Sequence, residues 1–408
     1  MEMKVGYKQT EVGLIPEDWE VVNLGAVARG INRGASPRPI DDPRWFDEAS
    51  NIGWVRISDV TQSGRYLTET TQRLSQDGVR HSRYVPSGAL IMSICATVGR
   101  PVETRIDTCI HDGFVLFDRP QVEQGFLYHV LKELEPRWSS KGQTGSQMNL
   151  NTGLIKGTRI PLPPTKAEQE AIAESLSNVD VLIESLERLL VKKRHLKQGA
   201  MQQLLTGQTH LPGFHEEWEV KRIGDLIEAI GDGGTPSTAN PHNFGGAINW
   251  VVIDDIRDEI TTTATTLTDR GLRSCAAKLW KPGTLIVSTG ATIGEVGIAR
   301  IPVATKQGIC GIFVNQAKAN TSFLKYWFVQ NKSLLMSKAQ GSTIKEVRAP
   351  TLVQFEISTP PVSEQTAIAT ILIDMDAELM VLEAYRNKTH EIKQGMMQKL
   401  LTGRIRLK

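Results

Sequence analysis

Apolar residues recur at alternating steps of four and three along residues 166–207, and the pattern returns along 363–404. That spacing is the seam of a coiled coil, so two long helices are predicted. The seam residues are Ile172, Leu176, Val179, Ile183 and Leu186 in the first segment, and Ile368, Leu372, Met375, Leu379 and Leu382 in the second. We expect these side chains to pair the two helices with each other. Packing of each helix on its own domain is the alternative.

Local signals mark the ends of both helices. Thr165 and Glu168 have the spacing of a capping box, and Ser363 is the expected N-cap of the second helix. Both segments end in Thr-Gly, where Gly207 and Gly403 can adopt the left-handed conformation that closes a helix. Nearly forty residues at 1.5 Å per residue predict rods of roughly 55–60 Å.

The two helical segments are near copies of each other. Residues 168–207 and 364–403 are identical at 19 of 40 positions without a gap. The upstream parts echo more weakly, as in Trp54-Val55-x-Ile57-x-Asp59 against Trp250-Val251-x-Ile253-x-Asp255. Such self-similarity indicates an internal duplication. The predicted layout is a globular domain at 1–165, a long helix at 166–207, a second globular domain at 208–362, a second long helix at 363–404 and a tail at 405–408.

The globular segments read as α/β (α+β). Short β-rich apolar runs at 89–94 and 284–288 follow turns at Gly88 and Gly283, and helices are expected at 123–134 and 321–330. A compact domain commonly has neighbouring termini, so the second helix must run back along the first. The predicted fold is therefore two tandem-duplicated globular domains separated by two long antiparallel coiled-coil helices, with pseudo-twofold symmetry.

Composition sets broad limits. The 408 residues are 40% hydrophobic and 23% charged, which is typical of globular material, and the formal net charge is only +2. No apolar run approaches the roughly 20 residues of a membrane span, and the first residues do not read as a signal peptide. The four cysteines show no CxxC spacing, so we expect free thiols in a reducing cytoplasm rather than a zinc site or disulfides.

No candidate catalytic group occurs in both halves of the sequence. There is no GxxxxGK[ST] phosphate loop and no HExxH metal pair. His111-Asp112 could act as an acid–base pair, but its counterpart is Lys306-Gln307. Two copies of one domain without a shared catalytic constellation favour binding over catalysis, and no metal ligand is predicted.

Loops rich in Gly, Ser, Thr, Gln and Lys occupy matching places in both halves. Their backbone amides, hydroxyls and ammonium groups suit phosphate oxygens and base edges, although simple turns are the alternative. The predicted DNA-binding residues are Ser36, Arg38, Lys141, Gln143, Ser146 and Gln147 in the first half, and Thr235, Ser237, Lys306, Gln307, Ser342, Thr343 and Lys345 in the second. Lysines are expected mostly at phosphates, glutamines and Arg38 at base edges.

The whole arrangement resembles the specificity subunit of type I restriction–modification systems. The resemblance is carried by the Pro-Pro-x-x-x-Glu-Gln helices ending in Leu-Leu-Thr-Gly, by the entry phrase at 15–21, by Gly-Thr-Pro-Ser at 234–237 and by Gly-Ala-Thr-Ile-Gly at 290–294. It covers essentially the full chain. The first domain departs from the pattern with Ala35-Ser36-Pro37-Arg38 and Cys95-Ala96-Thr97-Val98-Gly99.

The resemblance implies a protein without catalysis of its own. Each recognition domain would read one half of an asymmetric, two-part site on double-stranded DNA. The helices would set the spacer and dock two methyltransferase subunits that use S-adenosylmethionine. A restriction subunit that uses ATP and Mg²⁺ would complete the complex.

Two other classes remain open. They are a self-contained nuclease or methyltransferase with fused recognition domains, for which the chain has no spare length, and a scaffold that binds protein alone.

Gly199 and Gly395, within the helices, are expected to pack closely against the partner helix or against a methyltransferase helix, with a leftover of duplication as the alternative.

Overall fold

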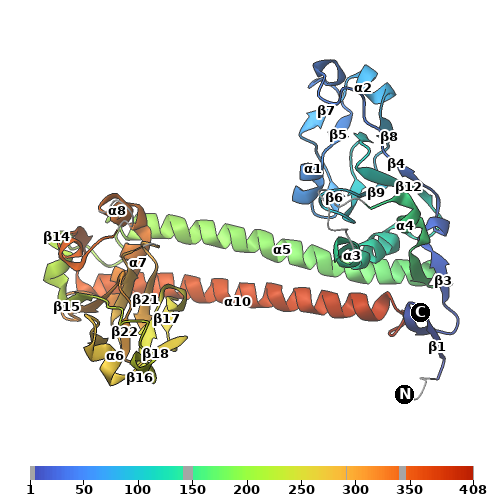
Figure 1. Cartoon of the computed structure of the whole chain (residues 1–408). Helices are drawn as coiled ribbons and strands as arrows, with labels where there is room; N and C mark the ends of the chain where they lie inside the picture. Colours follow the sequence, from blue (N-terminus) through green and yellow to red (C-terminus); the bar gives the residue numbers. More distant parts are fainter. Residues whose placement is uncertain (1–4, 141–149, 291, 340–345, 408) are drawn as a thin grey trace. The chain divides into compact units, whose positions relative to one another are not determined.

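The computed structural model describes residues 5–140, 150–290, 292–339 and 346–407 (Figure 1). These residues form two compact units. Unit 1 comprises Met1–Glu187 together with Tyr385–Lys408, and unit 2 comprises Arg188–Ala384. Each unit therefore contains a globular part and stretches of both long helices, α5 (Lys166–Leu204) and α10 (Val362–Leu400).

Two mixed sheets form the globular part of unit 1. The five-stranded sheet has the order β4 (Ala28–Arg33), β12 (Phe114–Pro120), β9 (Leu90–Ser93), β10 (Pro101–Thr104) and β6 (Tyr66–Leu67). The four-stranded sheet has the order β7 (Gln72–Arg73), β5 (Gly53–Val55), β11 (Thr108–Ile110) and β8 (Arg83–Val85). Two ribbons pair β1 (Tyr7–Thr10) with β2 (Gly13–Pro16), and β3 (Glu20–Asn23) with β13 (Arg159–Leu162). The short helices are α1 (Ile57–Gln62), α2 (Gln76–Arg80), α3 (Gln124–Ser140) and α4 (Thr152–Gly157), with 3-10 turns at Leu24–Ala26 and Pro43–Trp45.

Unit 2 repeats both sheets and the second ribbon of this topology. Its five-stranded sheet has the order β15 (Ile227–Asp232), β23 (Ile309–Val314), β20 (Leu285–Ser288), β21 (Val296–Ala299) and β17 (Glu259–Ile260). The four-stranded sheet has the order β18 (Thr265–Leu267), β16 (Phe244–Val251), β22 (Val303–Thr305) and β19 (Leu279–Trp280), and a ribbon pairs β14 (Glu219–Arg222) with β24 (Glu356–Thr359). The short helices are α6 (Asp269–Arg273), α7 (Thr321–Gln330), α8 (Lys332–Ser337) and α9 (Ala349–Leu352), with 3-10 turns at Ile223–Leu226, Pro241–Asn243 and Ile253–Asp255. The α/β class and the tandem duplication are confirmed.

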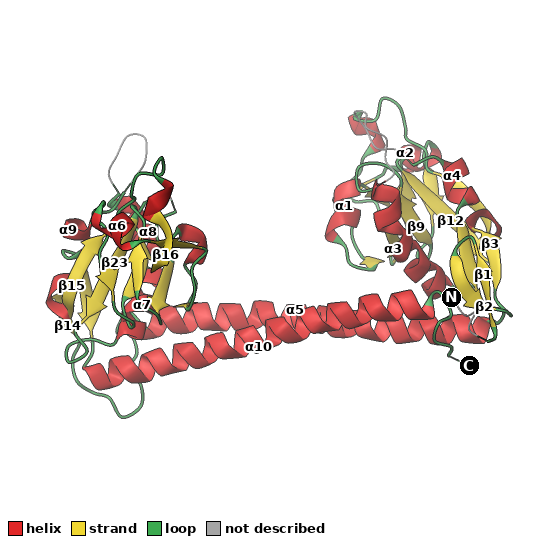
Figure 2. Cartoon of the chain, turned by 60° about the horizontal axis from the view of Figure 1, so that its bottom comes forward, coloured by secondary structure: helices red, strands yellow, loops and turns green. Residues whose placement is uncertain are grey.

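In each unit one helix lies against the larger sheet, α3 beside β10 and α7 beside β21. Figure 2 shows α3 next to the sheet that contains β9 and β12. Together with the first turns of α5, helix α3 closes a core that includes Trp19, Phe117, Phe126 and Ile172. The last turn of α10 enters the same core. The core of unit 2 is built equivalently, from the first turns of α10 and the last turn of α5.

The two long helices run antiparallel within each unit. In unit 1, Lys393 of α10 pairs with Asp180 of α5, and His390 lies 3.7 Å from Glu187. In unit 2 the equivalent ion pair is Lys197 with Asp376. An offset of 196 residues converts one lysine–aspartate pair into the other, so the duplication extends to contacts between the helices.

Most of the predicted seam residues are buried. Ile172, Leu176, Ile183, Leu186, Ile368 and Leu372 are buried, whereas Val179, Met375, Leu379 and Leu382 are half-buried. Ile172 and Leu176 share a core cluster with Met397 and Leu400 of α10, whose positions lie outside the predicted set. The helices therefore pack most tightly where each one enters a domain.

The repeated Glu-Gln pair fastens each helix start to its domain. Gln169 donates to the Pro163 carbonyl (3.0 Å) and accepts the amide at the start of α3 (2.9 Å). Gln365 makes the equivalent bonds in unit 2, both at 2.9 Å. The glutamines are nearly fully buried, so these bonds satisfy polar groups that water does not reach.

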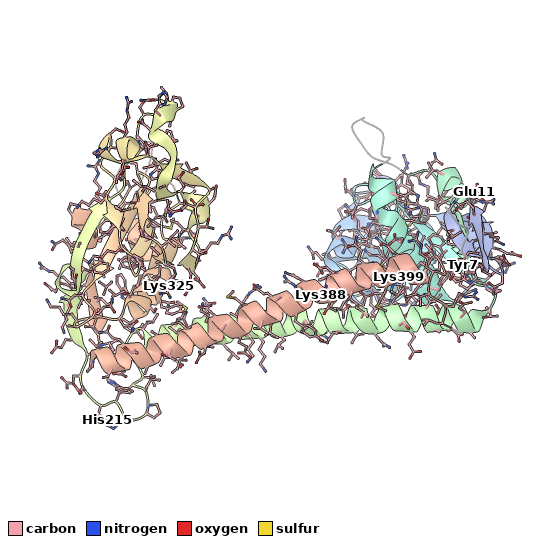
Figure 3. All side chains as sticks on the ribbon, turned by 90° about the horizontal axis from the view of Figure 1, so that it is seen from below. Tyr7, Glu11, His215, Lys325, Lys388 and Lys399 are labelled. Atoms are coloured by element: carbon pink, nitrogen blue, oxygen red, sulfur yellow. The ribbon has the colours of Figure 1, made fainter. Side chains whose placement is uncertain are left out.

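The preceding glutamates bind the segment that follows the other long helix. Arg406 forms a bidentate ion pair with buried Glu168, and it also bonds Asp18 (2.7 Å). His210 occupies the matching place in unit 2, with Nδ1 3.3 Å from the Glu364 carboxylate. In unit 1, Tyr7 also donates to the Gly403 carbonyl (3.1 Å), near the helix end that carries Lys399 (Figure 3).

Three local expectations need correction. Thr165 accepts the Glu168 amide (3.3 Å) as predicted, but the Glu168 carboxylate binds Arg406 and does not reach back to complete the capping box. Helix α10 begins at Val362, so Ser363 lies in its first turn and is not the N-cap. Helix α3 runs to 140, well past the predicted end at 134. Gly207 (φ +73°) and Gly403 (φ +68°) adopt the predicted left-handed conformation.

Candidate nucleic-acid interface

A pocket opens at the same place in both units. In unit 2 it has a volume of about 440 Å³ and is lined by Thr235, Ile253, Lys306 and Gln307, among others. In unit 1 a pocket of about 330 Å³ is lined by Ile40, Arg56, Ile57, Ser58 and His111. Ile57 corresponds to Ile253 in the repeat, and His111 corresponds to Lys306. The duplicated scaffold therefore presents one site twice, with different side chains around it.

Glycine allows the loop that carries Thr235 to lie against the end of β22. The amides of Gly233 and Gly234 donate to the carbonyls of Ile309 and Thr305, both at 2.9 Å. A Cβ on Gly233 would lie 2.1 Å from the Lys306 carbonyl oxygen, so no other residue fits without moving the backbone. Gly34 has the same relation to His111, with a Cβ at 2.0 Å. This contact brings Thr235 beside Lys306.

A second pair of positions, Gly290 and Gly308, lines the unit 2 pocket and differs from its counterpart in unit 1. In unit 2, Gly290 and Gly308 approach each other so closely that a Cβ on Gly290 would lie 3.1 Å from the Gly308 Cα. In unit 1 the counterpart of Gly290 is Cys95, and a Cβ on Gly113 would meet the Cys95 Sγ at 2.5 Å. The Cys95 side chain therefore occupies, in unit 1, the space that Gly290 leaves open in unit 2.

The unit 1 pocket carries a neutral imidazole. Burial lowers the pKa of His111 to about 4, and nearby Arg56 acts in the same direction while Asp112 opposes it. His111 Nδ1 accepts the Gly113 amide (2.9 Å), so the ring proton resides on Nε2 as a hydrogen-bond donor. Arg56 adds a permanent cation that also lines the pocket.

Ser36 serves the protein's own structure. Its hydroxyl donates to Asp112 (2.7 Å), and this bond lowers the pKa of the Asp112 carboxyl. Arg33 donates to the Asp112 carbonyl oxygen (2.6 Å). The serine hydroxyl and the carboxylate thus hold the 34–38 loop against the turn after β11, and Ser36 is poorly placed to donate to a ligand.

The other predicted DNA-binding residues divide into three groups. Thr235, Lys306 and Gln307 are brought together around the unit 2 pocket. Arg38 and Ser237 are exposed on the loops that border the two pockets, at matching positions of the repeat. Seven residues lie outside the described part of the chain: Lys141, Gln143, Ser146, Gln147, Ser342, Thr343 and Lys345.

Sequence reasoning missed Arg56 and Glu346, which line the unit 1 and unit 2 pockets respectively. Arg56 occupies the variable position of Trp-Val-x-Ile-x-Asp, where unit 2 has Val252. That variability inside a repeated frame is a usable signal. The frame itself is structural, because Asp59 accepts the Arg56 amide (2.8 Å) and Asp255 accepts the Val252 amide (2.9 Å).

A second duplicated surface lies on the long helices. Leu189 and Leu196, seven residues apart on α5, are 37% and 51% exposed. Their counterparts Tyr385 and Ile392 on α10 are 51% and 48% exposed. A spacing of seven places each pair on one helix face. Repetition of an exposed apolar pair suggests two equivalent binding events.

Gly199 and Gly395 continue these faces by one turn. A Cβ on either glycine would meet no heavy atom within 4 Å. The expectation of close packing against the partner helix is therefore wrong. A methyltransferase helix or a leftover of duplication remains as the explanation.

Within the described residues, no group of three or more His, Cys, Asp or Glu side chains could hold a metal ion. The described helices include none that is long and apolar enough to cross a bilayer. Cys109 and Cys310 are buried and Cys95 and Cys275 half-buried, all as free thiols.

Similarity to known proteins covers nearly the whole chain. The family model of the type I restriction modification DNA specificity domain matches residues 16–192 and again 215–394. The protein named as the MjaX type I restriction enzyme specificity subunit, from Methanocaldococcus jannaschii, is 25% identical, over 98% of this chain and 97% of that one.

Two solved structures share the fold. A chain from work on assembly and conformational transition of the type I R-M system superposes with a TM-score of 0.61 at 18% identity, covering 96% of this chain and 99% of that one. The type I restriction–modification S subunit of M. genitalium superposes with a TM-score of 0.60 at 12% identity, covering 98% of each chain.

Proposed function

Because this chain belongs to the family of type I restriction–modification specificity subunits, we propose that its two units read the two halves of a split, asymmetric site on double-stranded DNA. The observation that carries this proposal is the pair of matching pockets with unlike linings. A shared scaffold places recognition groups equivalently, while different side chains select different base edges.

The pocket side chains have the chemistry of groove recognition. Arg56 and the His111 Nε2–H group offer donors in unit 1. Lys306, Gln307 and Thr235 offer donors and acceptors in unit 2. Exposed Arg38, together with Lys141 and Lys345, which lie outside the described residues, would add contacts to the phosphate backbone, and such contacts position the protein without reading sequence.

The long helices have two further roles in this proposal. They set the distance between half-sites, and their exposed apolar pairs, Leu189–Leu196 and Tyr385–Ile392, dock two methyltransferase subunits. The duplication supports a stoichiometry of two, since each pair belongs to one copy of the repeat. S-adenosylmethionine would be used by those subunits, and ATP and Mg²⁺ by restriction subunits that join the complex.

The test is reconstitution. The isolated chain should neither methylate nor cut DNA, and addition of its cognate methyltransferase subunit should produce adenine methylation at a two-part site. Methylation by the chain alone, after removal of contaminating enzyme, would identify a self-contained enzyme. Salt-independent association with protein and no DNA binding would identify a protein scaffold.

A further inference from the structure

The unit 2 pocket contains an acid, which is unusual in a surface meant for DNA. Glu346 lines the pocket with Lys306 and Gln307, and its side chain is 24% exposed. Its ion-pair partner among the described residues is Arg348, at 3.8 Å, and the Arg348 side chain is 75% exposed. Such a long contact to a solvated guanidinium leaves the carboxylate oxygens available to another donor.

A carboxylate in this position restricts what it can bind. It accepts hydrogen bonds and cannot donate them, and phosphate oxygens repel it. In the major groove the hydrogen-bond donors are the exocyclic amines, cytosine N4 and adenine N6. Glu346 therefore fits a base edge and does not fit the DNA backbone.

Lys306 narrows the choice to one base pair. Its ammonium group only donates, and in the major groove it suits the O6 and N7 acceptors of guanine. A G·C pair offers both partners side by side, an amine donor on cytosine and two acceptors on guanine. An A·T pair does not fit in the same way, because the adenine N6 amine, a donor, stands where guanine presents its O6 acceptor to the ammonium group.

We propose, on the basis of the DNA-reading function proposed above, that the unit 2 pocket reads one G·C base pair. Glu346 accepts from cytosine N4, and Lys306 donates to guanine O6 and N7. Unit 1 cannot read a base pair in this way. His111 stands there in place of Lys306. Asp112 stands in place of Gln307, and its carboxylate is held by the Ser36 hydroxyl. A G·C pair read by a glutamate and a lysine together therefore belongs to the unit 2 half-site alone.

The experiment uses the full chain in complex with its cognate methyltransferase, and sequences methylated adenines across a genome. Glu346→Gln removes the charge but keeps the shape, and an amide can donate as well as accept. We expect methylation at sites where another pair replaces that G·C to rise roughly five- to a hundredfold, the discrimination that one good base contact supplies. The other half-site should not change. Non-cognate DNA should bind more tightly, since a charge that repels phosphate has been removed.

Two matched variants serve as controls. Glu356→Gln makes the same change on β24, at an exposed position that does not line the pocket, and should leave the motif unchanged. Arg348→Ala should also leave it unchanged, and a relaxed motif in this variant would make Glu346 a partner of Arg348 and overturn the proposal.

Other outcomes also decide the matter. A two-part motif that Glu346→Gln leaves intact, or a unit 2 half-site without a G·C pair, overturns the reading while the proposed function stands. Equal loss of methylation at all sites, with unchanged sequence preference, assigns Glu346 to structure and overturns it as well. Absence of any two-part motif with the unaltered protein contradicts the proposed function itself.

Discussion

Arg56 in unit 1 and Val252 in unit 2 occupy the same place in the repeat. This one difference gives the unit 1 pocket a hydrogen-bond donor that unit 2 lacks at that place. Arg56 lines the unit 1 pocket beside His111. Arginine binds guanine O6 and N7 through two parallel hydrogen bonds from its planar guanidinium group.

We predict that Arg56→Ala weakens cognate binding by about 1–3 kcal/mol and relaxes one position of the unit 1 half-site. Equilibrium binding and mapped methylation sites measure the two effects. Arg80→Ala is the control, because Arg80 belongs to the same unit, lies outside the pocket and has a 73% exposed side chain. Uniform weakening with a salt slope lower by about 1 would instead place Arg56 at a phosphate.

Unit 1 contains a buried histidine, His129, at a place where unit 2 has a tyrosine, and this difference should make unit 1 less stable than unit 2 at acid pH. Burial lowers the pKa of His129 to about 3, and Arg65 and Lys393 act in the same direction. Its Nε2 lies 3.2 Å from the Ser177 hydroxyl, and its Nδ1 has no hydrogen-bond partner among the described residues. In unit 2 the matching residue is Tyr326, which donates to Asp376 (2.7 Å).

The sign of the pH effect follows from these values. Between about 6.5 and 3 the unfolded chain protonates His129 while the folded unit does not, so unit 1 loses stability as pH falls. The loss is up to about 1.4 kcal/mol per pH unit, and His111 adds to it down to about pH 4. Hydrogen exchange against pH should show unit 1 opening first. His129→Tyr, which copies unit 2, should reduce the difference; equal acid sensitivity of both units would contradict this assignment.

At the scale of elements, the long helices were readable from sequence and the pockets were not. Heptad spacing, the Thr165 cap and the terminal glycines are local signals, and α5 and α10 follow them within a few residues. Sheet order depends on contacts between residues far apart in the chain. Thr235, Lys306 and Glu346 meet around one pocket only after nine strands have been ordered in two sheets. Comparison of the two halves of the sequence therefore found Thr235 and Lys306 but did not find Glu346.

The exposed glycines give a prediction about the helices. Gly199→Ala and Gly395→Ala should each stabilise the chain by about 1 kcal/mol, because the new methyl group meets open space and alanine favours helix. Chemical denaturation measures this. Gly207→Ala is the contrast, since its φ of +73° strains any side chain and should lower stability.

The same variants bear on methyltransferase docking. If a partner helix approaches at these glycines, the alanine variants will bind the methyltransferase subunit more weakly although they are more stable themselves. Unchanged methyltransferase affinity would mean that the glycines are a leftover of duplication.

At the scale of the whole molecule, the proposed ruler can be lengthened. Seven residues inserted into α5 after Glu187, with seven inserted into α10 before Tyr385, preserve the heptad phase of both helices. We predict that the tolerated spacer grows by about three base pairs, since two helical turns add roughly 11 Å, while both half-sites stay the same. Mapped methylation sites give the answer. An unchanged spacer would show that the helices do not measure DNA.

The two segments that make up unit 1 are synthesised at different times. Unit 2 is one continuous stretch of chain, whereas unit 1 combines residues 1–187 with residues 385–408. Met397 and Leu400 fill its core, and Arg406 neutralises its buried Glu168. These residues are synthesised only after the whole of unit 2. Unit 1 is therefore begun first but completed last, so a chain that stops before residue 385 lacks core residues of unit 1 while all of unit 2 is present.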